Sequence, residues 1–157
     1  MLNNLTKNDL VGIWGTGKVG RSAAHLLVSL DINVIFFDEH KPLTWDLPYQ
    51  VEYDIEKFFS KITHLLPSPG VPQKKYIQRD VKIISEIDLF SQIYQGKSIA
   101  ITGTVGKTST VSLISHYLTK LGLKSPALGN IGNPLLDAKL TSCLLYTSDA
   151  ADDTPCV

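Results

Sequence analysis

The chain has 157 residues, of which 43% are hydrophobic and 19% charged, and its 15 basic residues are balanced by 15 acidic ones. This composition is typical of a globular protein with a real core, and the balanced charge argues against a nucleic-acid partner or a membrane-surface patch. The polar start and the lack of a long apolar run predict a cytoplasmic protein with no membrane segment. Cys143 and Cys156 are the only cysteines, which excludes a disulfide framework or a zinc-ligand spacing.

A glycine-rich turn opens the chain between an apolar strand and a helix. The strand is predicted over residues 10–14, and the turn reads Gly15-Thr16-Gly17-Lys18-Val19-Gly20. A second strand, predicted over residues 32–37, ends at Asp38, where a carboxylate could hold a ribose hydroxyl. The pattern G-x-G-x-x-G in this context predicts a Rossmann-like nucleotide site. Two alternatives stay open: the glycines could serve strand–helix packing alone, and Asp38 could be a solvated carboxylate.

Strands and helices continue to alternate after this turn. The pattern predicts a helix over 53–62, a strand over 63–66, a rigid turn at Ser68-Pro69-Gly70-Val71-Pro72, a strand over 81–84 and a helix over 86–94. Repeated strand–helix units of this kind predict an α/β fold, a parallel sheet with helices on both faces. The break at Gln95-Gly96-Lys97 places a domain boundary near residue 94.

The most specific motif is the phosphate-binding loop Thr102-Gly103-Thr104-Val105-Gly106-Lys107-Thr108, which lies between a predicted strand over 98–101 and a helix. Glycines at these positions let successive backbone N–H groups point toward an anion, and the helix adds its positive N-terminal end. Lys107 would reach the β- and γ-phosphates of a nucleotide, and the Thr108 hydroxyl would bind the bridging Mg²⁺. Ile101 stands where the longer Walker pattern has glycine, so the match is to the form T-G-T-x-G-K-T. An ordinary strand–helix turn that carries a lysine is the alternative.

Two further motifs are Glu86-Ile87-Asp88-Leu89-Phe90 and Gly129-Asn130-Ile131-Gly132. Together with the motifs above, in their order and spacing, they make residues 8–137 resemble the Mur ligases. The resemblance implies a Rossmann-like domain for a UDP-linked substrate, followed by a P-loop domain that binds ATP and Mg²⁺. It further implies a ligase of peptidoglycan synthesis that activates the carboxylate of UDP-N-acetylmuramoyl-L-alanine as an acyl phosphate and joins it to D-glutamate. We expect a monomer. An alanine-adding member of the family, an NAD-dependent oxidoreductase and a nucleotide-binding module without catalysis are the alternatives.

The resemblance also implies roles for individual residues. The UDP part of the substrate would be lined by Gly15, Thr16, Gly17, Lys18, Asp38, Ser68, Pro69 and Gly70. The ATP phosphates would be held by Gly103, Thr104, Val105, Gly106, Lys107, Thr108 and Ser109. Lys107 would be catalytic, because its charge stabilises the transferring phosphoryl group, and Thr108 would be the metal ligand. Asn130 would contact the muramoyl substrate, although a left-handed turn would also explain an asparagine between two glycines.

Two departures from the family pattern affect these expectations. Val105 stands where a polar residue such as asparagine is usual; its backbone should still bind phosphate, but a side-chain contact could be lost. The run that begins Cys143-Leu144-Leu145-Tyr146 resembles translated sequencing-adapter sequence, with a genuine flexible tail as the alternative. We therefore expect a UDP-substrate domain over 1–94, a truncated ATP-binding domain over 95–141 and a non-native tail over 142–157. A chain of this kind is expected not to catalyse the ligation by itself.

Overall fold

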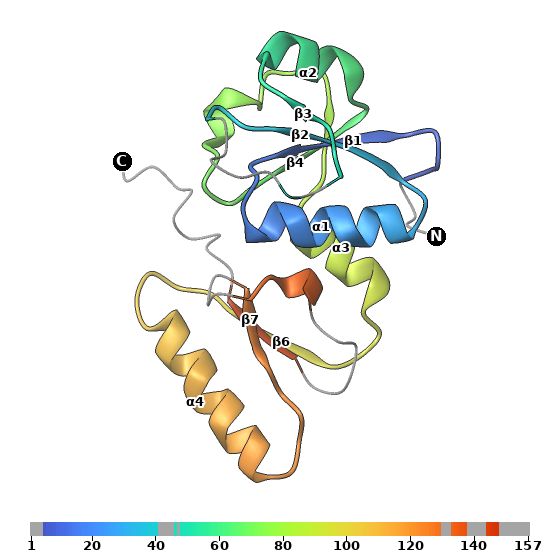
Figure 1. Ribbon diagram of the computed structural model, residues 1–157. Coiled ribbons are helices and arrows are strands. Elements are labelled where there is room, and N and C mark those ends of the chain that lie inside the picture. The colour runs from blue at the N-terminus through green and yellow to red at the C-terminus, as the bar shows by residue number, and fades with distance from the viewer. Residues whose placement is uncertain (1–4, 41–45, 47, 130–132, 138–143, 148–157) are drawn as a thin grey trace. The chain divides into compact units, whose positions relative to one another are not determined.

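The structure is a computed structural model that describes residues 5–40, 46, 48–129, 133–137 and 144–147 (Figure 1). The chain forms two compact units, one over residues 1–93 and the other over residues 94–157. No helix in the described part of the chain is both long enough and apolar enough to span a bilayer.

The first unit is built on a parallel five-stranded sheet with the strand order β3-β2-β1-β4-β5. Its strands are β1 (Leu10–Trp14), β2 (Asn33–Phe37), β3 (Val51–Glu52), β4 (His64–Pro67) and β5 (Lys82–Ile83). The central strand β1 pairs with β2 on one side and β4 on the other, so that the chain reverses its winding direction there. The carboxyl ends of these three strands therefore meet at one edge, where ligands bind in open α/β sheets.

Helices cover both faces of this sheet, with α1 (Lys18–Ser29) and α2 (Ile55–Lys61) on opposite sides (Figure 1). Successive residues of β1 show why. A Cβ atom at Gly12 would lie 2.5 Å from Cζ of Phe58 in α2, whereas a Cβ atom at Gly20 of α1 would lie 3.0 Å from Cγ2 of Ile13. Neighbouring residues of a strand point to opposite faces, so each helix packs against its own face. The buried core cluster on this sheet consists of Trp14, Ile35, Phe37, Phe58, Leu65 and Tyr76.

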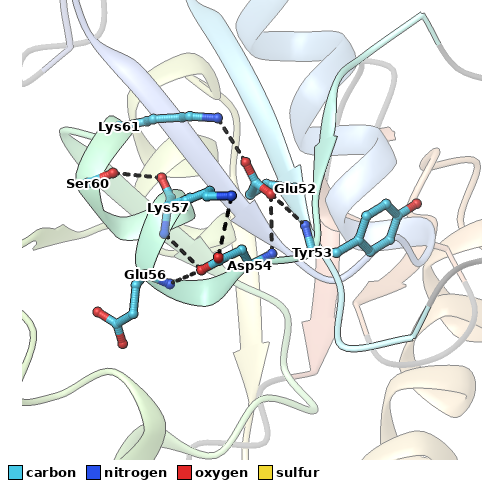
Figure 2. Close-up of polar contacts among 7 residues, drawn as sticks. All are labelled: Glu52, Tyr53, Asp54, Glu56, Lys57, Ser60 and Lys61. Atoms are coloured by element: carbon cyan, nitrogen blue, oxygen red, sulfur yellow. Dashed lines mark hydrogen bonds and ion pairs between the residues drawn. The ribbon is translucent and has the colours of Figure 1, made fainter.

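Helix α2 begins at Ile55 because side-chain oxygens satisfy the backbone N–H groups before and within its first turn (Figure 2). The Asp54 carboxylate accepts hydrogen bonds from the N–H groups of Glu56 and Lys57, at 3.0 and 3.2 Å. Oε1 of Glu52 accepts from the N–H of Asp54 at 3.2 Å, and its Oε2 pairs with the Lys61 ammonium at 2.8 Å. These contacts fix both ends of a helix that is shorter than the predicted 53–62.

The remaining helices of the first unit are the 3₁₀ turn η1 (Gln73–Lys75) and α3 (Glu86–Ile93), which buries Leu89 and Phe90. The predicted helices and the strands at 10–14, 32–37, 63–66 and 81–84 are confirmed within a few residues, as is the parallel α/β sheet. The two-residue strand β3 was not predicted, because Val51–Glu52 is too short to show a period.

The second unit contains a parallel three-stranded sheet, in which β8 (Leu144–Thr147) lies between β6 (Ser98–Ile101) and β7 (Ala127–Gly129). Helix α4 (Lys107–Lys120) connects β6 to β7, and the 3₁₀ turn η2 covers Leu135–Asp137. The strand β8 lies within the segment 142–157 that the sequence analysis assigns to a tail. A short β-prone run can pair there because β6 and β7 each present an open edge to it. The rest of that segment lies outside the described residues, and its origin stays a prediction.

Candidate functional site

The first glycine-rich turn joins β1 to α1 under tight steric limits. Gly15 has a φ of +111°, and a Cβ atom on it would lie 2.5 Å from the Ser68 hydroxyl oxygen. A Cβ atom on Gly20 would lie 2.4 Å from the backbone oxygen of Gly15. Strand–helix packing therefore accounts for these two glycines. A Cβ atom on Gly17 would meet nothing within 4 Å, so that position lies open on the surface of the turn.

Asp38 holds the turn from the end of β2. Its Oδ2 accepts hydrogen bonds from the N–H and the hydroxyl of Thr16, at 3.0 and 2.7 Å, and its Oδ1 accepts from the N–H of His40 at 3.1 Å. Burial opposes ionisation of this carboxyl, but the hydrogen bonds outweigh it and hold the pKa of Asp38 below its ordinary value. The side chain is thus a fixed carboxylate. Because a carboxylate offers about four lone-pair positions, Oδ1 keeps capacity for a further donor such as a ribose hydroxyl.

The turn after β4 places Ser68 beside the glycine-rich turn. The Ser68 N–H donates to the Trp14 carbonyl at 2.9 Å, and the Ser68 carbonyl accepts from Val71 at 2.9 Å. The Ser68 hydroxyl oxygen is buried and has no hydrogen-bond partner among the described residues. A buried hydroxyl without a partner costs about 1–3 kcal/mol, which a bound polar group could recover. The next two residues, Pro69 and Gly70, are exposed.

These contacts bring Gly15, Thr16, Asp38 and Ser68 together at the carboxyl ends of β1, β2 and β4. Their role in binding a nucleotide stays a prediction. Sequence reasoning missed Arg21, whose Nε donates to the Thr16 carbonyl at 3.0 Å and whose guanidinium pairs with Asp46 at 2.7 Å. It also missed the ion pair between Lys75 and Glu39, 2.5 Å long, which links the segments after β4 and β2. A basic residue one turn into the helix is the only local signal for Arg21, and it is common in helices.

The second glycine-rich loop joins β6 to α4, and the space around its two glycines is open. Gly103 and Gly106 have φ values of +146° and +84°, and a Cβ atom on either would meet nothing within 4 Å. The Lys107 ammonium donates to the Gly103 carbonyl, so its charge already lies over the loop. Val105 is 90% exposed, which agrees with a position that would act through its backbone. An anion bound in this loop would meet an ammonium and backbone N–H groups.

The starts of the four α-helices differ in how they are capped. Asp54 caps α2, and Ser85 and Asp88 satisfy each other's backbone N–H groups at the start of α3. Helices α1 and α4 instead begin after Gly17 and Gly106. Neither has a side-chain cap or an acidic residue in its first turn among the described residues. The positive N-terminal ends of these two helices are therefore the ones available to an outside anion.

The other predicted site residues are placed as follows. Thr104, Thr108 and Ser109 are exposed in the loop and the first turn of α4, and Lys18 is exposed in the first turn of α1. Asn130 lies outside the described residues. Within the described part of the chain, no group of three or more His, Cys, Asp or Glu side chains could hold a metal ion.

No protein-family model matches the chain, but comparison with known proteins finds similar sequences. The chain is 35% identical over 147 residues to the UDP-N-acetylmuramoylalanine–D-glutamate ligase of Wolbachia pipientis wMel, covering 85% of this chain and 29% of the relative. It is 36% identical over 152 residues to the ligase of that name from Rickettsia prowazekii, covering 88% and 34%. For the ligase of that name from Chlamydia trachomatis serovar D, the identity is 32% over 139 residues, covering 82% and 33%. The chain thus spans about a third of the length of these curated relatives.

Two solved structures share the fold. A UDP-N-acetylmuramate:L-alanyl-γ-D-glutamyl-meso-diaminopimelate ligase from Neisseria meningitides matches with a TM-score of 0.51 and 17% identity, over 89% of this chain and 52% of that chain. A pseudomurein peptide ligase type C from Methanothermus fervidus matches with a TM-score of 0.50 and 21% identity, over 90% and 33%. At these identities, the likeness concerns the fold alone.

Proposed function

The chain belongs to the Mur ligase family, and from this premise we propose that it binds the two nucleotides of an ATP-dependent ligase of peptidoglycan synthesis. The ligase would add D-glutamate to UDP-N-acetylmuramoyl-L-alanine. The observation that carries the proposal is the pair of glycine-started helices, α1 and α4, whose positive ends are left without protein caps in the described residues. The relatives that bear the name of this activity support the choice of amino acid.

The uridine nucleotide would bind at the first turn. Asp38 offers a fixed carboxylate oxygen to a sugar hydroxyl, and the buried Ser68 hydroxyl gains a partner when a polar group enters. The N-terminal end of α1 and the exposed Lys18 and Gly17 provide positive potential for the diphosphate. Pro69 and Gly70 would form the exposed rim of this subsite on the β4 side.

ATP would bind at the second loop. The left-handed backbone at Gly103 and Gly106 turns the loop around an open space, and Lys107 lies across it. Thr104, Val105 and Ser109 would contribute to the phosphate cradle, while Thr108 would bind Mg²⁺. Asn130 would contact the muramoyl substrate.

The chemistry assigned to these residues is positioning and charge stabilisation. ATP with Mg²⁺ would supply the γ-phosphoryl group that activates the substrate carboxylate for capture by the amino group of D-glutamate. Lys107 would leave the Gly103 carbonyl and stabilise the negative charge that spreads over the transferring phosphoryl oxygens. The α1 turn would hold the diphosphate of the uridine nucleotide. A protein nucleophile is not required for this reaction.

Calorimetric titration of the full chain with UDP, ATP–Mg²⁺ and NAD tests the proposal. UDP and ATP–Mg²⁺ should bind independently, with UDP affinity weakened by Asp38→Asn and ATP affinity weakened by Lys107→Ala. Two exposed residues provide matched controls: Asp80→Asn in the first unit and Lys120→Ala at the far end of α4 should leave the affinities unchanged. Binding of NAD without any response to UDP would contradict the proposal and favour an oxidoreductase.

A further inference from the structure

Arg21 makes contacts that join three parts of the first turn. Its Nε donates to the Thr16 carbonyl oxygen at 3.0 Å, and its guanidinium pairs with Asp46 at 2.7 Å. Its own backbone N–H donates to the Gly17 carbonyl at 3.0 Å. A guanidinium can reach a carbonyl and a carboxylate at once because its donors are spread over a rigid planar fork.

This contact fixes the direction of one peptide group. No cis peptide bond occurs in the described chain, so the carbonyl of Thr16 and the N–H of Gly17 point in opposite directions. Because Arg21 holds the Thr16 carbonyl on its own side, the N–H of Gly17 faces away from it. The two preceding backbone N–H groups already donate hydrogen bonds within the protein. The Gly15 N–H donates to the Phe37 carbonyl, and the Thr16 N–H donates to the Asp38 carboxylate.

The surroundings of Gly17 leave space for a ligand. A Cβ atom at this position would meet nothing within 4 Å, and Gly17 is the N-cap of α1 with an extended backbone, at φ −73° and ψ −175°. Its N–H is therefore the first in the turn that can turn toward an anion at the positive end of the helix.

We infer that Arg21 is a positioning residue for the diphosphate of the bound uridine nucleotide, because it orients the Thr16–Gly17 peptide toward the phosphate oxygens. This inference rests on the proposed function. Arg21 need not touch the ligand, since its charge is already paired with Asp46, which lies on the segment after β2. A substitution of Arg21 should therefore weaken binding of the diphosphate and leave binding of the nucleoside nearly unchanged.

Calorimetry with two ligands separates this role from a structural one. Arg21→Gln should weaken UDP binding roughly tenfold, as expected for a misdirected hydrogen bond to a charged group, and should change uridine binding less than about twofold. Arg21→Lys should recover part of the UDP affinity, because an ammonium can still donate to the Thr16 carbonyl. The matched control Asp46→Asn removes the ion pair, keeps the Nε contact and should leave both affinities within about twofold of the wild type.

Equal losses for UDP and uridine, or no loss for either, would overturn the inference. Should Arg21→Gln fail to fold, the amide resonance of Gly17 in the wild-type chain decides: UDP should shift it strongly and uridine should not, and an unmoved resonance would refute the role. A wild-type chain that binds no UDP would instead refute the proposed function itself, so the two failures are distinguishable.

Discussion

The two glycine-rich turns look alike in the sequence, but their glycines answer to different physical demands. At the first turn, neighbouring atoms leave no room for a side chain at Gly15 or Gly20, and Gly15 also has a positive φ. At the second, Gly103 and Gly106 meet no neighbour within 4 Å and are needed only for their left-handed backbone. The first turn is therefore packed tightly against the rest of its unit. The glycines of the second loop have no such contacts, so the conformation there depends on the backbone of the loop itself.

This difference separates stability from binding. A change at the first turn should disturb the fold of its unit, and a change at the second should disturb a ligand with little effect on the fold. The burial of the two helices agrees with this contrast. Helix α1 buries five residues, Gly20, Ser22, Ala23, Ala24 and Leu27, whereas α4 buries Val111. Leu113 and Tyr117 of α4 are more than half exposed.

The largest effect is expected from Gly20→Ala. The new methyl group would lie 2.4 Å from the Gly15 carbonyl, so the backbone must shift, at a cost of about 3 kcal/mol. Urea unfolding followed by the fluorescence of buried Trp14 measures this loss. Gly17→Ala, which meets nothing within 4 Å, should change the free energy of unfolding by less than about 0.5 kcal/mol. Similar stability of the two variants would show that the close contact at Gly20 does not constrain the first turn.

A smaller and more selective effect is expected from Gly106→Ala. A left-handed φ costs a non-glycine residue about 1–2 kcal/mol, and we expect this cost to appear as a roughly tenfold loss of ATP–Mg²⁺ affinity. Gly122→Ala is a matched control, since Gly122 also has a positive φ of +81° and open surroundings but follows the far end of α4. Gly122→Ala should introduce the same kind of backbone strain and leave the ATP–Mg²⁺ affinity unchanged. Equal loss of ATP affinity in both variants would show that the loop has no special role.

Acidification should weaken the first unit through His64. Burial lowers the pKa of this histidine, Asp9 opposes the shift and Lys82 adds to it. The folded state therefore binds fewer protons than the unfolded state, so stability is full above the ordinary pKa of about 6.5 and falls as the pH drops below it. Urea midpoints between pH 8 and pH 5 should decline, and His64→Phe should flatten that part of the decline. The exposed His116→Phe is the control, and an unchanged slope in His64→Phe would refute the assignment.

The smallest effect concerns the ion pair between Lys75 and Glu39, which joins the segments after β4 and β2. Both side chains are about 40% exposed, so screening keeps their coupling below about 1 kcal/mol. A double-mutant cycle with Lys75→Gln and Glu39→Gln, read out as UDP affinity, should give a small coupling at low salt that disappears near 0.5 M salt. A coupling that persists at high salt would mean that the pair acts through something other than charge.

Much of the fold followed from local pattern. The apolar strands, the glycine-started helices and the parallel order could be predicted, because each depends on the spacing of apolar residues and on turn glycines. The position of β8 between β6 and β7 could not, because pairing depends on which strand edges are open in the folded unit. The Rossmann-like pattern drew attention to Asp38, but it did not predict the hydrogen bonds between Asp38 and Thr16, the Ser68 hydroxyl without a partner among the described residues, or the Arg21 contact.

By itself, the sequence determined where two anion-binding turns lie and which residues they contain, because backbone freedom at glycine and helix polarity are local properties. Only the tertiary structure decided what each glycine is for and which side chains support it. A Cβ atom added to Gly15 would lie 2.5 Å from the Ser68 hydroxyl oxygen, and Asp38 accepts hydrogen bonds from Thr16, which is 22 positions earlier in the chain. Such distances are set by the order of parallel strands, since that order brings residues far apart in the chain to a common edge.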